Sequence, residues 1–163
     1  MDSENLKAML MQVQSGQMDL ETALHQLKKL PFEDIGYAKV DTHRCVRSGV
    51  PEVIYCEGKT SPQIQGIVEK LSQHHCNILA TRAGREVFDG IRKITEDSEY
   101  HEMARIVVVK PRSVEKVGNI AVVCAGTSDI PVAEEAAVTA EALGNHVNRL
   151  YDVGVAGIHR LLG

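Results

Sequence analysis

The first thirty residues repeat apolar side chains every three or four positions. This spacing predicts two short amphipathic helices within residues 4–30, separated at Gly16. Asp19 is expected to cap the second helix, and Pro31 is expected to end it. Because each helix has one apolar and one charged face, we expect a helical hairpin that packs on a partner surface. The apolar positions are Leu6, Met9, Leu10, Val13, Leu20, Ala23, Leu24, Leu27 and Leu30.

From residue 37 onward, short β-branched runs alternate with helical stripes. The expected elements are extended segments at 38–41, 53–56, 77–81 and 103–109, a helix capped by Ser61 with Pro62 in its first turn, and a helix over 84–94. The buried stripe of the first of these helices is Ile64, Ile67, Val68 and Leu71. The order strand, helix, strand over 53–81 predicts a right-handed βαβ unit.

The last third of the chain has a second βαβ pattern. A polar stretch punctuated by Pro and Gly at 111–118 is the predicted linker. It is followed by a strand at 119–124, a loop at 125–129, a helix at 130–143 with Gly144 as its C-cap, a strand at 146–153 and a helix start near 157. The predicted fold class is therefore α/β. A small N-terminal α/β domain (1–110) with a leading helical hairpin precedes the start of a doubly wound parallel sheet (119–163), which we expect to be incomplete.

Composition narrows the function classes. The net charge of −4, the 4% aromatic content and the absence of Trp argue against nucleic-acid binding. No segment reaches the roughly 18 apolar residues of a membrane helix, and the first residues lack the pattern of a secretory signal. We therefore expect a cytoplasmic protein without membrane association. The cysteines Cys45, Cys56, Cys76 and Cys124 lack paired spacing and are expected to be free thiols.

The loop at 125–129 is the first candidate binding segment, because it joins the end of a strand to the start of a helix. In an open α/β sheet that position forms the ligand crevice. Gly126 allows close backbone approach, Thr127 and Ser128 offer hydroxyls, and the helix N-terminus offers amides to an anion.

Two features favour a plainer interpretation of this loop. Pro131 removes one helix donor, and Glu134 and Glu135 place negative charge in the first turns. Ser128 or Asp129 could also act only as an N-cap. The local pattern leaves ligand binding and simple capping open.

Two further segments carry candidate chemistry. His159 and Arg160 follow the second strand at the same predicted sheet edge, where His can move a proton and Arg can clamp a phosphate, although such a pair is often solvated surface. Asp41, Arg44 and Arg47 are the N-terminal candidates for substrate binding. Arg44 and Arg47, three positions apart, could grip one anion; the alternative is two surface arginines, one of them bonded to Asp41. The run His74-His75-Cys76 lacks the spacing of a structural zinc site and is interpreted as surface.

The two C-terminal segments together resemble the opening of aminoimidazole ribonucleotide carboxylase domains. The matching strings are Gly126-Thr-Ser-Asp-Ile-Pro131 and Tyr151-Asp-Val-Gly-Val-Ala-Gly-Ile-His-Arg160. The resemblance implies that Gly126, Ser128 and Asp129 hold substrate phosphate and ribose, and that His159 carries a proton. Gly157 and Ile158 stand where that family has Ser and Ala, so the reaction need not be the purine one.

The string over 41–60 and the string Leu79-Ala-Thr-Arg-Ala83 resemble the lactate racemase maturation factor B family, which takes part in nickel-pincer cofactor biosynthesis. The resemblance runs from the N-terminal helices to Gly163. It implies an enzyme that carboxylates the pyridinium ring of nicotinic acid adenine dinucleotide, with CO2 or bicarbonate as co-substrate. The enzyme also hydrolyses the phosphoanhydride to release AMP. No bound organic cofactor is implied, Mg²⁺ could assist the hydrolysis, and the carboxylase relatives form octamers.

The family's nucleophile is a Cys in a C-terminal region, and none of the four cysteines matches its context. We therefore expect this chain to be an inactive fragment of that enzyme. Two alternatives stay open: a non-catalytic nucleotide-binding module, and a purine-pathway carboxylase relative. The long N-terminal segment argues against the second, which would begin near Asn119.

Overall fold

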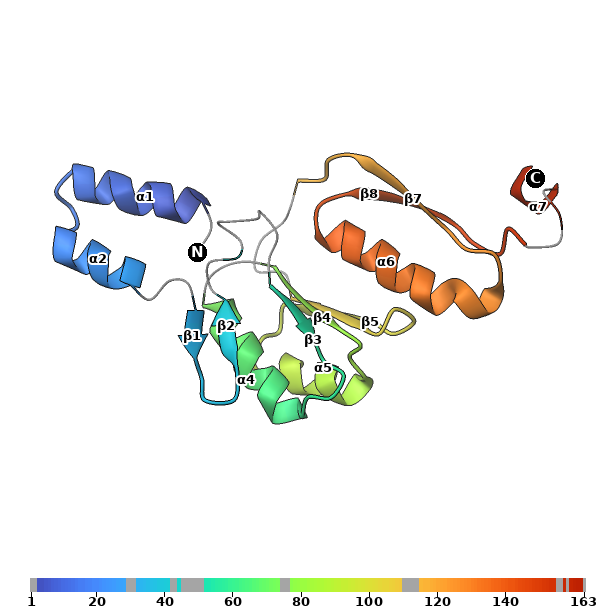
Figure 1. Cartoon of the computed structure of the whole chain (residues 1–163), viewed down its shortest axis with the longest axis horizontal. Coiled ribbons are helices and arrows are strands. Elements are labelled where there is room, and N and C mark those ends of the chain that lie inside the picture. Colours follow the sequence, from blue (N-terminus) through green and yellow to red (C-terminus); the bar gives the residue numbers. More distant parts are fainter. Residues whose placement is uncertain are drawn as a thin grey trace.

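A computed structural model describes residues 3–28, 32–41, 44, 52–73, 77–109, 115–154, 157 and 159–162. The chain begins with two helices, α1 (Ser3–Gln14) and α2 (Leu20–Lys28), as predicted. Gly16 separates them with a φ of +75°, and Asp19 Oδ1 accepts the Thr22 N–H at 2.8 Å, which confirms Asp19 as the cap. The hairpin lies to one side of the sheets (Figure 1).

A small antiparallel hairpin follows, formed by β1 (Phe32–Asp34) and β2 (Lys39–Asp41). The extended segment expected near residue 39 is confirmed, but its partner β1 was not predicted. The turn is held by Asp34 Oδ1, which accepts the Gly36 N–H at 2.8 Å, while Gly36 adopts a φ of +87°. Three-residue strands carry almost no periodicity of their own, so only their pairing reveals them.

The main sheet has four strands in the order β3-β4-β6-β5. These are β3 (Val53–Tyr55), β4 (Ile78–Thr81), β6 (Ile106–Val109) and β5 (Ser98–His101). β3 and β4 are parallel and are joined by helix α4 (Ser61–Ser72), as the βαβ pattern predicted. Thr60, however, is the N-cap of α4 rather than Ser61, and its N–H donates to Gln63 Oε1 at 2.9 Å.

The remaining strands of this sheet depart from the prediction. β6 runs antiparallel to both β4 and β5, and β5 was not predicted. The strand expected to begin at residue 103 begins only at Ile106, because Arg105 adopts a φ of +52° in the turn that leads from β5. The sheet is therefore mixed, whereas the C-terminal pair described below is parallel.

Side chains alternate between the two faces along each strand, and every residue of the inner strands β4 and β6 is buried. Helices α4 and α5 (Arg85–Arg92) cover one face (Figure 1), where Ile78, Val107 and Val109 join the larger core cluster. On the other face, Leu79, Ile106 and Val108 pack with Val138 of helix α6 (Ile130–Ala142).

The C-terminal part consists of β7 (Asn119–Val123), the short 3₁₀ turn η1 (Thr127–Asp129), α6, β8 (His146–Leu150) and the short helix α7 (His159–Leu162). β7 and β8 are parallel, so the second βαβ prediction and the α/β fold class are confirmed. β8 ends at Leu150 rather than at 153, because Asp152 adopts a φ of +57°. Gly144 has a φ of +85° just after α6, the backbone geometry common where a helix ends.

Figure 1 shows the resulting order of layers: α4 and α5, then the main sheet, then α6, then β7 and β8. Of the predicted linker 111–118, the described residues are 115–118. Within the described part of the chain, no helix combines the length and apolar character needed to span a membrane.

Candidate functional site

The ends of β7 and β8 lie side by side. The Cys124 N–H donates to the Leu150 carbonyl at 3.1 Å, and the Val153 N–H donates back to the Cys124 carbonyl at 3.2 Å. The Gly154 N–H then donates to the Ala125 carbonyl at 2.7 Å. The segment that leads to His159 therefore leaves the sheet beside the 125–129 loop, as the sequence predicted.

The loop itself is closed by a reciprocal pair of hydrogen bonds. The Gly126 N–H donates to Asp129 Oδ2 at 3.0 Å, and the Asp129 N–H donates to the Gly126 carbonyl at 3.0 Å. Asp129 makes no side-chain cap bond to α6, so its carboxylate closes the η1 turn instead. Thr127 and Ser128 are exposed, which leaves their hydroxyls accessible to a ligand, whereas the Gly126 amide already has an acceptor.

Gly126 is not required by the backbone. Its φ of −127° and ψ of 163° are extended values that any residue adopts. A Cβ at this position would meet Asp129 Oδ2 at 3.7 Å and Ser128 Oγ at 3.9 Å, which are ordinary contacts. The fold would therefore accept a side chain here, and the glycine leaves the backbone without a Cβ that could block an approaching group.

In the segment that follows β8, two polar side chains lie against glycines of the same segment. Arg160 Nη2 forms an ion pair with Asp152, and a Cβ at Gly154 would lie 2.9 Å from Arg160 Cδ. A Cβ at Gly157 would lie 2.5 Å from His159 Cε1. In this arrangement, the expected phosphate clamp Arg160 is engaged by Asp152, and exposed His159 lies over Gly157.

The N-terminal candidate residues lie elsewhere. Asp41 ends β2, and Arg44 Nη1 lies 3.6 Å from Glu52 Oε2. Arg47 is outside the described residues. β2 and the start of α6 lie at opposite sides of the molecule (Figure 1), so Asp41 does not join the 126–129 loop.

The two described cysteines, Cys56 and Cys124, are both buried. Burial raises the pKa of Cys56 to about 11, so its thiol stays protonated near neutral pH. Cys124 is also buried, and its Sγ lies 3.8 Å from the Gly126 carbonyl. Cys45 and the run 74–76 fall outside the described residues. Among the residues that are described, no three His, Cys, Asp or Glu side chains gather in a way that could hold a metal ion.

An ionic clamp that the sequence did not reveal ties β8 to α6. Arg149 Nε lies 3.0 Å from Glu134 Oε1, and Arg149 Nη1 lies 2.7 Å from Glu141 Oε1. These bonds lower the pKa of Glu141 and raise the pKa of Arg149. Glu135 is paired as well, with Arg82 Nε at 2.9 Å. The negative charge expected to crowd the start of α6 is thus neutralised.

Comparison with known protein families finds a similarity for the part of the chain that holds the main sheet. Residues 32–112 match the family model described as the LarB/PurE-like N-terminal domain. Because of this match, residues 32–112 are called the LarB/PurE-like domain below.

A relative extends the similarity to nearly the whole chain. An uncharacterized protein of Methanocaldococcus jannaschii is 37% identical over 166 residues, which cover 97% of this chain. The chain spans 65% of the length of that relative.

The LarB/PurE-like domain has a cavity of its own, of about 210 Å³, between the β1–β2 hairpin and the main sheet. It is lined by Ala38, Lys39, Val40, Glu52, Val53, Ile54, Tyr55, Lys59 and Ile67. Two lysines and one glutamate give it mixed charge. Of the string 41–60 that was singled out in the sequence, the residues that line this cavity are Glu52, Val53, Ile54, Tyr55 and Lys59. The described Arg44 pairs with Glu52.

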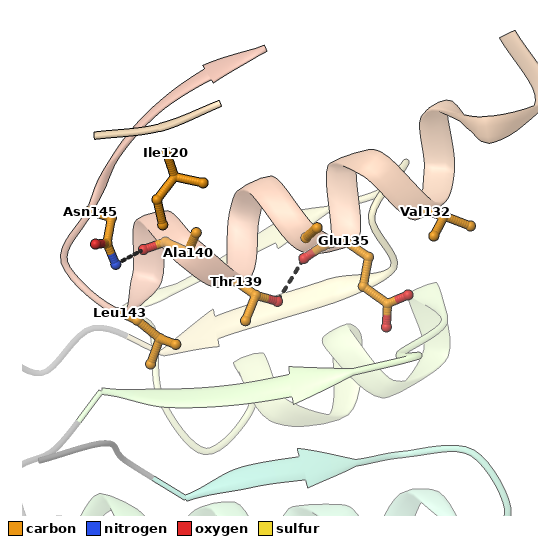
Figure 2. A pocket seen from close by; sticks show the side chains of 8 residues that line it. Ile120, Val132, Glu135, Thr139, Ala140, Leu143 and Asn145 are labelled. Carbon is orange, nitrogen blue, oxygen red and sulfur yellow. Dashed lines mark hydrogen bonds between the residues drawn. The ribbon is translucent and has the colours of Figure 1, made fainter. Parts of the chain in front are cut away.

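A second hollow, of about 410 Å³, follows the flank of α6 (Figure 2). Its apolar lining includes Ile120, Val132 and Leu143. The polar groups along it are paired: Asn145 Nδ2 donates to the Ala140 carbonyl at 3.0 Å, and Thr139 Oγ1 donates to the Glu135 carbonyl at 2.6 Å. This surface offers apolar contact and few free polar groups, unlike the 125–129 loop at the ends of β7 and β8.

Proposed function

We propose that the protein acts in nickel-pincer cofactor biosynthesis as a carboxylase and hydrolase of nicotinic acid adenine dinucleotide. The observation that carries this proposal is the LarB/PurE-like domain at residues 32–112. The parallel βαβ unit that follows it supports the same proposal, because its two strand-end loops share one sheet edge. A carboxylase-type enzyme needs a crevice of this kind to hold a phosphorylated substrate beside a proton carrier.

The proposed substrate contacts are assigned to side chains and backbone of the two loops that are exposed to solvent. The exposed hydroxyls of Thr127 and Ser128 would donate to the diphosphate, and the open backbone at Gly126 would let it approach. Asp129 would shape the loop through the Gly126 amide and accept a ribose hydroxyl. Arg160 would exchange Asp152 for a phosphate, since both side chains are about half exposed.

The chemistry requires a nucleophile and a proton carrier. A cationic pyridinium ring does not attack CO2, but adding a nucleophile to the ring makes it enamine-like, and its C5 can then form the new carbon–carbon bond. Loss of the C5 proton and release of the nucleophile restore the aromatic ring. We propose that His159 takes that proton. Cys56 is too deeply buried and too weakly acidic to be the nucleophile.

Three accompanying roles belong to the same proposal. CO2 or bicarbonate is the co-substrate, and the protein assembles as a homo-oligomer. Mg²⁺ would supply charge neutralisation for the hydrolysis of the diphosphate. The described residues offer no cluster of acidic, His or Cys side chains for this ion, so we assign no step to it.

The test is product analysis with the protein expressed from its complete gene. Incubation with nicotinic acid adenine dinucleotide and ¹³C-bicarbonate should release AMP and yield a pyridinium mononucleotide heavier by one labelled carboxyl group. His159→Asn should abolish carboxylation, whereas His25→Asn, on the distant helix α2, should leave the rate unchanged. Binding without AMP or labelled product would contradict the catalytic proposal and would indicate a nucleotide-binding module.

A further inference from the structure

Arg82 links the LarB/PurE-like domain to α6. It directly follows β4 and adopts a φ of +55°, a left-handed conformation that non-glycine residues seldom take. Its Nε lies 2.9 Å from Glu135 Oε1. The two residues are 53 positions apart in the sequence, so this ion pair joins two separately predicted units.

Helix α6 is anchored unevenly on the main sheet. Its C-terminal half places Val138 and Ala142 in a cluster with Leu79, Ile106 and Val108. In its N-terminal half the buried residue is the small Ala133, and Val132 is 65% exposed. Small side chains set how close the helix lies but do little to fix its rotation. The Arg82–Glu135 pair is a directional contact in this half of the helix.

Arg82 is itself held in place by its neighbours. Arg105 Nη2 donates to the Arg82 carbonyl at 3.5 Å, and Arg105 also has a positive φ. Glu57 lies in the same charged neighbourhood and accepts a hydrogen bond from the Tyr55 hydroxyl. The pairing with Glu135 raises the pKa of Arg82, so the guanidinium remains protonated at all ordinary pH values.

The rotation of this helical half matters for the candidate site. Helix α6 begins at Ile130, directly after η1, and the Asp129 carboxylate closes the loop onto the Gly126 amide. Glu135 lies within the first two turns of the helix, so a shift at Glu135 is passed to the loop through continuous helical backbone.

We infer that Arg82 is a positioning residue, which orients the N-terminal half of α6 and thereby the Gly126–Asp129 loop. The LarB/PurE-like domain would then contribute to ligand binding without touching the ligand. The effect on loop order stands by itself, and only the effect on dinucleotide affinity rests on the proposed function.

The test is amide hydrogen exchange across the whole chain in Arg82→Gln. We expect exchange at Gly126 and Asp129 to rise by about two- to fivefold, the range expected for loss of a partly exposed ion pair. Arg85→Gln is the matched control, because it breaks the exposed Arg85–Asp89 pair on α5 and should leave the loop unchanged. The double variant Arg82→Glu with Glu135→Arg should restore protection, and Arg82→Lys should retain part of it.

Unchanged exchange at the loop in Arg82→Gln, or an equal rise throughout the chain, would overturn the inference. The dissociation constant for nicotinic acid adenine dinucleotide should rise by about the same factor in Arg82→Gln as exchange does. If the unaltered protein does not bind this dinucleotide, the proposed function fails, while the exchange result still decides the role of Arg82.

Discussion

The two βαβ units of this protein have similar sequence patterns but very different burial. In the LarB/PurE-like domain, every residue of β4, and of the antiparallel strand β6 beside it, is buried because helices cover both faces of the sheet. In the C-terminal unit, Val123 and Leu150 are about half exposed, although four of the five residues of β7 are apolar. The sequence pattern of a strand therefore indicates which side chains can be buried. Whether they are buried depends on the layers that pack against the strand.

The two units also differ in what they offer a ligand. The first has buried strand interiors and a small mixed-charge cavity, while the second has exposed hydroxyls on a loop at a sheet edge. The second unit rests on the first through α6. We therefore expect the first unit to supply most of the stability and the second to supply most of the binding.

The largest expected effect comes from separating the units. Residues 119–163 expressed alone should show no cooperative thermal unfolding and should aggregate, because α6 would lose Leu79, Ile106 and Val108 as partners. Circular dichroism on heating, with light scattering, would check this. A cooperative unfolding transition from a monomer would show that the C-terminal unit does not depend on the main sheet.

Matched truncations in the two units should differ strongly. Ile106→Ala, at a fully buried site, should lower the free energy of unfolding by about 2–4 kcal/mol, because it leaves a cavity. Ile120→Ala, at a side chain 37% exposed, should cost less than about 1 kcal/mol, since little area leaves the core. Urea unfolding measures both values, and equal losses would contradict the difference in burial.

A smaller effect is expected from the ionic clamp within the C-terminal unit. Arg149→Gln should lower the free energy of unfolding by about 1 kcal/mol, because Glu134 and Glu141 both lose a partner on a partly solvated surface. Arg92→Gln, on α5, provides a comparison outside the clamp. A loss above the Ile106→Ala value would mean that β8 depends on charge more than on packing.

The same clamp predicts a pH dependence of modest size. Since Arg149 lowers the folded-state pKa of Glu141, its stabilising contribution is complete above the usual glutamate pKa of about 4.3. It is lost as the pH falls through the lower folded-state pKa. The stability difference between the unaltered protein and Arg149→Gln should therefore shrink on acidification from pH 6 toward roughly pH 3. A difference that stays constant over this range would argue against the clamp.

The sequence predicted the helices and both parallel strand pairs, because these carry strong local periodicity and clear caps, as at Asp19. It did not predict β1 or β5. The segment Ser98–His101 is polar, and it becomes a strand through pairing with β6. The antiparallel direction of β6 could not be predicted either, because its run of Ile and Val is compatible with both strand directions.

In the candidate site, too, some features could be predicted from the sequence and others could not. The adjacency of the two C-terminal loops follows from parallel strand order, so it could be predicted. The Arg82–Glu135 and Arg149–Glu134 pairs could not, because they depend on how a helix and a sheet meet across long sequence separations. The engagement of Arg160 by Asp152 was also hidden, since it requires the positive φ values of Asp152 and Gly154.

The most direct test of the account is to locate nicotinic acid adenine dinucleotide on the protein by amide chemical shifts during a titration. We predict the largest changes at Gly126–Asp129 and in the segment from Val153 to Arg160. Changes at Lys39, Val40 and Lys59, with none at the loop, would place the ligand in the cavity of the LarB/PurE-like domain. That result would contradict the assignment of binding to the edge of β7 and β8.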